Sequence, residues 1–173
     1  VNRSYLKRLR NLANEIDPCW ISDHLCWTGV DGENMHDLLP LPYSEEAIAH
    51  VSEKIQIVQE YLGRKILIEN VSSYVEFAHQ EMPEWEFLRE ISKRSGCGIL
   101  LDINNIYVSS KNHGFDPLAF LKAMPISQVG QIHLAGHTNK GNYLIDTHDE
   151  KVCKEVWELY RWVARNFPPI SAM

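Results

Sequence analysis

Polar residues of the kinds that bind metal ions follow four short apolar runs in this sequence. The first run ends at His24, the second at Glu69 and the third at Asp102, and the fourth contains His133. Burying one such side chain without a partner is costly. Because two of the four are carboxylates, their burial at one place is favourable only if a cation compensates them. The recurrence therefore predicts a metal site.

Further candidate ligands lie close to these runs. Alternate residues of an extended segment face the same way, so the aspartate and histidine of an Asp-Thr-His motif after the fourth run can bind one ion together. Imidazole nitrogen with carboxylate or amide oxygen suits zinc, manganese or iron. The candidates exceed what one ion requires, so we expect two or three ions, with Glu69 able to bridge them. The candidate metal ligands are His24, Glu69, Asp102, Asn105, His133, Asp146 and His148.

Structural explanations compete at each position. A single histidine or aspartate at a strand end is more often a hydrogen-bonded structural residue, and Asp146 could simply cap the next helix. The pair Asn104-Asn105 could form an ordinary turn. His137 could lie beside the metal centre, in a substrate pocket or in a turn. The remaining histidines have no supporting pattern, and we expect them on the surface or in loops; they are His36, His50, His79 and His113.

The helices predicted between these runs explain how the ligands would be positioned. One apolar stripe runs along the segment from Ser44 to Gly63, where the serine can cap the helix and the glycine can end it. Other helices are expected to begin at Pro83, at Asp116-Pro117 and after Asp149, and the opening residues read as the end of a further helix.

Strands are predicted at residues 20–25, 65–71, 98–103 and 129–135. Two of them are continuously apolar, as in parallel sheets that are covered on both faces. Alternating strands and helices predict an α/β fold, and the absence of glycine-rich nucleotide-binding motifs favours a TIM (β/α)8-type barrel over a doubly wound sheet. About four to five βα units fit in residues 1–173, which we expect to form a single domain, a partial barrel carrying the metal site.

Composition restricts the function classes. The 173 residues carry a formal net charge of −6 with scattered basic residues, so no nucleic-acid partner is expected. No apolar run is long enough to span a membrane, and no export signal is recognisable. The four cysteines lack zinc-finger or redox spacing, which is typical of reduced, structural thiols and of a cytoplasmic protein.

Six motifs resemble one enzyme family in the same order along the chain. The family is the multinuclear non-heme iron-dependent oxidative enzymes, which include the methanobactin-biosynthesis oxidase. The resemblance implies a TIM barrel with two or three iron ions and molecular oxygen as co-substrate. It also implies modification of cysteine residues in a ribosomally synthesised precursor peptide, with a partner protein that binds the peptide's leader. The motifs occupy residues 22–27, 67–74, 100–108, 112–117, 132–137 and 145–148.

The resemblance places the family's metal positions on the seven candidate ligands named above, and we expect Glu69, Asp102 and His133 to be the catalytic residues among them. The family normally has an earlier strand with another histidine ligand and a later strand with a glutamate, and neither is found in residues 1–173. We therefore expect a fragment that is inactive alone. Two alternatives remain open: a divalent-metal sugar isomerase or endonuclease-like hydrolase, and a non-catalytic truncated barrel.

Overall fold

The computed structural model describes residues 1–172. None of the helices in this part of the chain is both long and apolar enough to cross a membrane. The helices are α1 (Arg3–Ile16), α2 (Glu45–Leu62), α3 (Glu84–Ser95), α4 (Ile103–His113), α5 (Pro117–Ala123) and α6 (Lys154–Asn166), with a 3-10 turn at Ile126–Gln128. The strands are β1 (Ser22–His24), β2 (Trp27–Val30), β3 (Glu33–Leu39), β4 (Leu67–Glu69), β5 (Gly98–Asp102), β6 (Val129–His133), β7 (Thr138–Asn139), β8 (Leu144–Ile145) and β9 (Ser171–Ala172).

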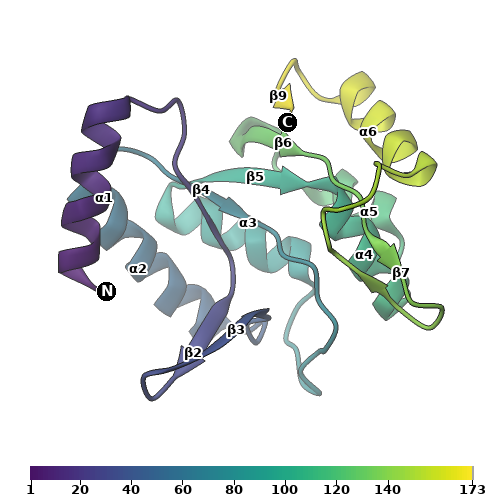
Figure 1. Cartoon of the computed structure of the whole chain (residues 1–173), viewed down its shortest axis with the longest axis horizontal. Coiled ribbons are helices and arrows are strands. Elements are labelled where there is room, and N and C mark those ends of the chain that lie inside the picture. Colours follow the sequence, from purple (N-terminus) through teal and green to yellow (C-terminus); the bar gives the residue numbers. More distant parts are fainter. Residues whose placement is uncertain (173) are drawn as a thin grey trace.

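Five strands form one parallel sheet in the order β1-β4-β5-β6-β9 (Figure 1). Each strand lies beside the next sheet strand along the chain, and at least one helix lies between successive members. This succession of βα units with spatially adjacent strands is the arrangement found along the wall of a (β/α) barrel. The predicted four to five units are therefore present.

Helix α2 shows how the local sequence sets the element boundaries. Ser44 has extended backbone angles, and its hydroxyl accepts a hydrogen bond from the Ala47 amide at 3.2 Å. Glu45 and Glu46 occupy the first turn, where the helix dipole favours negative charge. Gly63 ends the helix at a φ of 70°, in the left-handed region that glycine adopts most readily. The predicted start and end of this helix are thus confirmed.

The central strands have two differently occupied faces. One face packs against the helices in the main apolar core. The other carries Leu67 and Leu100, both almost fully buried, and two positions further along each strand come Glu69 and Asp102. Alternate residues of a strand share a face, so each of these carboxylates lies on the same side of the sheet as the leucine before it. The core-facing strand residues include Ile68, Ile99 and Leu101.

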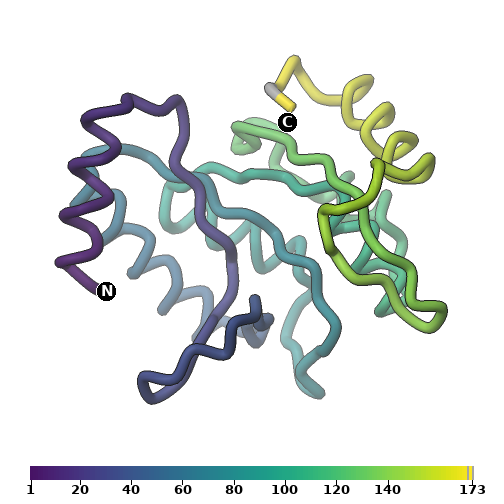
Figure 2. The backbone as a smooth tube through the Cα atoms, viewed as in Figure 1, coloured from purple at the N-terminus to yellow at the C-terminus, as the bar shows by residue number. Residues whose placement is uncertain are grey.

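Several elements differ from the sequence-based expectation. The third strand ends at Asp102, because Ile103 already begins α4, a helix that was not predicted. The opening helix begins at Arg3, where the Asn2 side chain caps it, so it is not merely the end of a helix. Two antiparallel hairpins, β2–β3 and β7–β8, project below the sheet in the view of Figure 2. The β2–β3 hairpin is largely exposed and the strands of β7–β8 are short, so neither hairpin has a strong apolar pattern in its sequence.

Candidate metal centre

Strand register brings four of the predicted ligands to one end of the sheet. His24 is paired with Glu69 across β1 and β4, and Asp102 is paired with His133 across β5 and β6. Each of the four is the last residue of its strand. In a (β/α) barrel the carboxyl ends of the strands surround the active-site mouth. The fold therefore gathers these side chains as the sequence pattern predicted.

Glu69 connects the two pairs. One of its carboxylate oxygens lies 3.4 Å from Nε2 of His24, and the other lies 3.5 Å from Nδ1 of His133. The Glu69 side chain is only 10% exposed, whereas that of His24 is 44% exposed. A carboxylate whose two oxygens face different imidazoles is suited to bridge two ions.

Asp102 is completely buried, and its side chain has two hydrogen-bond partners. Its Oδ2 is hydrogen-bonded to Nδ1 of His133, while its Oδ1 accepts a hydrogen bond of 2.7 Å from the Asn105 amide and so caps helix α4. The structural alternative is therefore partly correct, since Asp102 is a helix cap. Its second oxygen, Oδ2, still faces His133 within the cluster of candidate ligands at this end of the sheet.

Asn70 was missed by the sequence reasoning, although it fixes the geometry around Asp102. Its side chain accepts a hydrogen bond from the Asp102 amide and donates one to the Asp102 carbonyl, both 2.9 Å long. Its own carbonyl accepts a bond of 3.0 Å from the Asn105 side chain. The only signal in the sequence was its position immediately after Glu69.

The loop after β8 brings Asp146 and His148 to the same cluster. Oδ1 of Asp146 lies 3.4 Å from Nε2 of His148, and the ring of His148 lies 5.1 Å from that of His133. Asp146 does not cap the next helix, because α6 begins only at Lys154. His148 has a φ of 57°, a conformation that costs a non-glycine residue about 1–3 kcal/mol and is often found at functional sites.

This loop is held by close backbone packing at Gly136. The Gly136 carbonyl accepts a hydrogen bond of 3.2 Å from the His148 amide. A Cβ atom at Gly136 would lie 1.9 Å from the carbonyl oxygen of Glu150. Only glycine therefore allows the chain after β6 to approach the loop that carries Asp146 and His148.

The charges of the cluster favour retention of a proton when no metal is bound. Hydrogen bonding to Asp102 and then to Glu69 raises the pKa of His133 to about 10. Burial raises the pKa of Asp102 and also that of Asp146. These buried acceptors therefore attract a cation, which is a proton on His133 in the absence of metal.

The side chains present also fit a metal ion. Ligand atoms of Asp102, His133 and His148 all lie within 4.8 Å of one another, so these three residues could hold one ion together. Oδ1 of Asn105 is buried without a hydrogen-bond partner within residues 1–172, and such an oxygen is satisfied if it coordinates a cation. Glu69 lies beside His133 and Asp146 lies beside His148, while His24 contacts Glu69; these three residues do not belong to the group of three.

The other histidines divide into two groups. His36, His50 and His79 are exposed, as predicted. His113 differs, because its side chain is only 9% exposed, and its Nε2 lies 2.8 Å from the hydroxyl and 3.0 Å from the carbonyl of Ser73. It fastens the end of α4 to the loop after β4, a tertiary contact that local sequence does not reveal.

Three of the four cysteines are partly or fully buried, whereas Cys19 is exposed. All four are free, and Cys97 is fully buried. Burial, and then the nearby Asp23 carboxylate, raises the pKa of Cys26 to about 11. Burial is also the main cause that raises the pKa of Cys97 and Cys153. These three side chains therefore remain thiols near neutral pH and are poor metal ligands.

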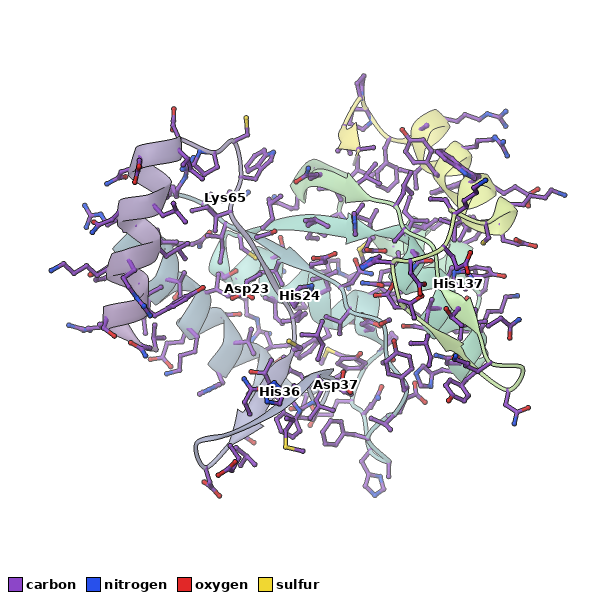
Figure 3. The ribbon with its side chains drawn as sticks, in the orientation of Figure 1. Asp23, His24, His36, Asp37, Lys65 and His137 are labelled. Carbon is purple, nitrogen blue, oxygen red and sulfur yellow. The ribbon has the colours of Figure 1, made fainter. Side chains whose placement is uncertain are left out.

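A polar cleft of about 480 Å³ opens beside the cluster. One wall belongs to the β2–β3 hairpin, which includes His36 and Asp37, and the opposite wall includes Tyr74 and Asp146. Figure 3 shows His36 and Asp37 on this hairpin, below His24 in the view. The Tyr74 hydroxyl accepts a hydrogen bond of 3.1 Å from the Asp146 amide. A ligand in this cleft would thus reach Asp146, one of the candidate metal ligands.

Comparison with known proteins identifies the family and the fold class of this chain. A family model described as RiPP precursor modification enzyme MbnB/TglH/ChrH matches residues 1–173. A UPF0276 protein of Anaeromyxobacter sp. is 58% identical over 173 residues, and one of Caulobacter vibrioides is 56% identical. Each alignment covers 100% of this chain but only 61% and 62% of the respective relative. The chain therefore spans about three fifths of the length of these relatives.

Two solved structures share the fold at low sequence identity. A xylose isomerase domain containing protein from Salmonella typhimurium matches with a TM-score of 0.56 and 13% identity, over 99% of this chain and 61% of that protein. The 3-keto-D-glucoside 4-epimerase of E. coli matches with a TM-score of 0.52 and 14% identity, over 96% and 60%. These likenesses confirm the predicted TIM-barrel fold class.

Proposed function

This chain belongs to the MbnB/TglH/ChrH family of RiPP precursor modification enzymes, and we propose that its protein is a non-heme iron-dependent oxygenase or oxidase that modifies cysteine residues of a ribosomally synthesised precursor peptide. The observation that carries the proposal is the family match over residues 1–173. The arrangement of Asp102, His133 and His148 adds chemical support.

The composition of this group favours iron as the metal. Two histidines and one carboxylate that leave coordination positions open are typical of non-heme iron(II) oxygenases. Asp102, His133 and His148 have this composition. His24, Glu69, Asn105 and Asp146 would complete the coordination of two or three ions. Bound iron would supply the one-electron and oxygen chemistry that no side chain provides.

The protein residues have distinct roles in this proposal. Glu69, Asp102 and His133 would be the catalytic residues, because their atoms would touch the metal ions at the buried end of the site. Capping of α4 and the bonds to Asn70 hold Asp102 in place, so its carboxylate requires little reorganisation on binding. His133 would release its proton from Nδ1 when metal binds, since the metal ligand is the neutral imidazole.

We further propose that the precursor peptide reaches the centre through the cleft between the β2–β3 hairpin and Tyr74. This cleft is lined mainly by polar residues, and it includes Asp146. Polar side chains such as Asn34 and Asp37 can hydrogen-bond an extended peptide backbone there. A partner protein that binds the leader, and a cytoplasmic location, complete the proposal.

The test is reconstitution of the full-length protein with iron(II) without oxygen, followed by addition of oxygen and a cysteine-containing precursor encoded beside its gene. We expect oxygen consumption and a mass change confined to the peptide, absent when its cysteines are replaced by serine. Asp102→Asn should abolish the mass change. Asp116→Asn makes the same substitution at the cap of the neighbouring helix α5 and should leave it intact. A mass change that survives Asp102→Asn, or one without oxygen, would refute the proposal.

A further inference from the structure

Asn104 connects a candidate metal ligand to a histidine outside the metal set. It lies in the first turn of α4 and is completely buried. Its Nδ2 donates a hydrogen bond of 2.7 Å to Oδ1 of Asp146, and its Oδ1 lies 2.8 Å from Nδ1 of His137. One amide group thus contacts both side chains.

The chemistry of these groups determines where the protons lie. Asp146 would bind a metal as the carboxylate, which can only accept, so in the metal-binding form the NH2 group of Asn104 faces Asp146. The Asn104 oxygen then faces His137, and because an amide oxygen also only accepts, Nδ1 of His137 must carry hydrogen. In a neutral imidazole with hydrogen on Nδ1, Nε2 retains the lone pair.

The surroundings of His137 keep the ring neutral and fixed. Burial lowers its pKa, and the ring lies 5.2 Å from that of Tyr107, on the same helix as Asn104. Figure 3 places His137 well apart from His24, beside the β7–β8 region. Within residues 1–172 no side chain or backbone group hydrogen-bonds Nε2 of His137. This nitrogen is therefore free to accept a hydrogen bond.

We propose that Asn104 is a positioning residue that orients the Asp146 carboxylate for metal binding and holds His137 in the Nδ1–H tautomer, with Nε2 available as an acceptor. The inference rests on the proposed metal centre. It does not depend on iron, on oxygen or on a peptide substrate.

The first test measures metal affinity with zinc(II), a redox-silent probe, by chelator competition in the full-length protein. Asn104→Leu keeps a similar shape but removes the donor to Asp146. Loss of such an outer partner weakens metal binding by about ten- to a hundredfold. Ser110→Ala is the matched control, because Ser110 is buried on the same helix and its hydroxyl donates to the Tyr107 carbonyl, its one hydrogen-bond partner among residues 1–172. An affinity of Asn104→Leu equal to that of the control would overturn the proposal.

The second test reads the tautomer of His137 by nitrogen-15 NMR on the zinc-loaded protein, with His137→Gln to assign the signal. We expect a pure Nδ1–H tautomer in the wild type and a shift toward Nε2–H in Asn104→Leu. Asn104→Asp keeps an acceptor for His137 and should preserve the wild-type tautomer, which also covers the case in which the leucine variant fails to fold. Nε2–H in the wild type or in Asn104→Asp would contradict the assignment. Both readouts remain informative if no peptide is ever oxidised.

Discussion

Asp102 and His133 are paired in register across adjacent parallel strands, and Oδ2 of Asp102 is hydrogen-bonded to Nδ1 of His133. The other oxygen of Asp102 caps helix α4. The bond to the backbone of α4 thus fixes the carboxylate, while its Oδ2 contacts the imidazole of His133. A hydrogen ion occupies this contact in the metal-free protein, and a metal ion would replace it by binding both residues.

The two functions of Asp102 can be separated by substitution. Asparagine caps helices about as well as aspartate, whereas alanine costs about 1 kcal/mol at such a position. We expect Asp102→Asn and Asp102→Ala to lose metal equally, while the alanine variant is less stable than the asparagine variant by about that amount in urea denaturation of the metal-free proteins. Equal stability of the two variants would show that capping by Asp102 contributes nothing.

Gly136→Ala should weaken metal binding although Gly136 supplies no ligand. The added Cβ meets the Glu150 carbonyl at 1.9 Å, so the loop carrying Asp146 and His148 must move. We expect zinc affinity to fall at least tenfold, because small displacements of ligands suffice to weaken a site. Gly141→Ala is the control, since no atom within 4 Å opposes a Cβ there, although its φ of 88° imposes strain of its own. Zinc affinity that is equal in both variants would contradict the packing argument.

Metal binding should strengthen as pH rises. The pKa of His133 is raised to about 10 by its contacts with Asp102 and Glu69, so below that pH a proton competes with metal for this imidazole. The ion pair stabilises the metal-free fold fully below the unfolded histidine pKa of about 6.5, and this contribution is lost as pH rises toward about 10. Between pH 6 and 8 the zinc affinity measured by chelator competition should therefore rise. The thermal unfolding temperature of the metal-free protein should fall over the same range. His133→Gln should make both trends shallower, and trends that persist unchanged would exclude His133 as a source of them.

Glu84 should make the fold less stable as pH rises from mildly acidic values to about 8. Burial raises its pKa to about 8, against a hydrogen bond with Tyr43 that lowers it and a contribution from Glu76 that raises it. Because the folded protein holds this proton more tightly than the unfolded chain, stability from this group falls as pH rises from about 4.5 to about 8. Glu84→Gln should remove the contribution of this carboxyl, so that denaturant midpoints measured from pH 5 to 8 fall less steeply than in the wild type. Glu86→Gln, at a carboxylate that is paired with Arg89 in the same helical turn, should retain the wild-type decline.

The sequence revealed those parts of the fold that depend on periodic apolar patterns. Helix α2 and the central strands have strong patterns, and the register then brings His24, Glu69, Asp102 and His133 together. Helix α4 was missed because it begins directly after a buried strand. The polar residues of its first turn, including Asn104, look like a turn when only local sequence is considered.

Contacts between distant residues could not be predicted from the sequence. Asn70 bonds the backbone of Asp102, and His113 bonds Ser73, across 32 and 40 residues respectively. Each contact depends on the tertiary placement of a single side chain, and a periodic pattern in the sequence does not predict such a contact. The Asn104 bridge between Asp146 and His137 belongs to the same class.

The most direct test of the metal centre is anomalous diffraction at the iron edge from crystals of the full-length protein reconstituted anaerobically with iron(II). We predict a peak bound jointly by Asp102, His133 and His148, with metal–ligand distances of about 2.0–2.3 Å. Absence of anomalous density among these three side chains, in a protein that retains its fold, would contradict the account.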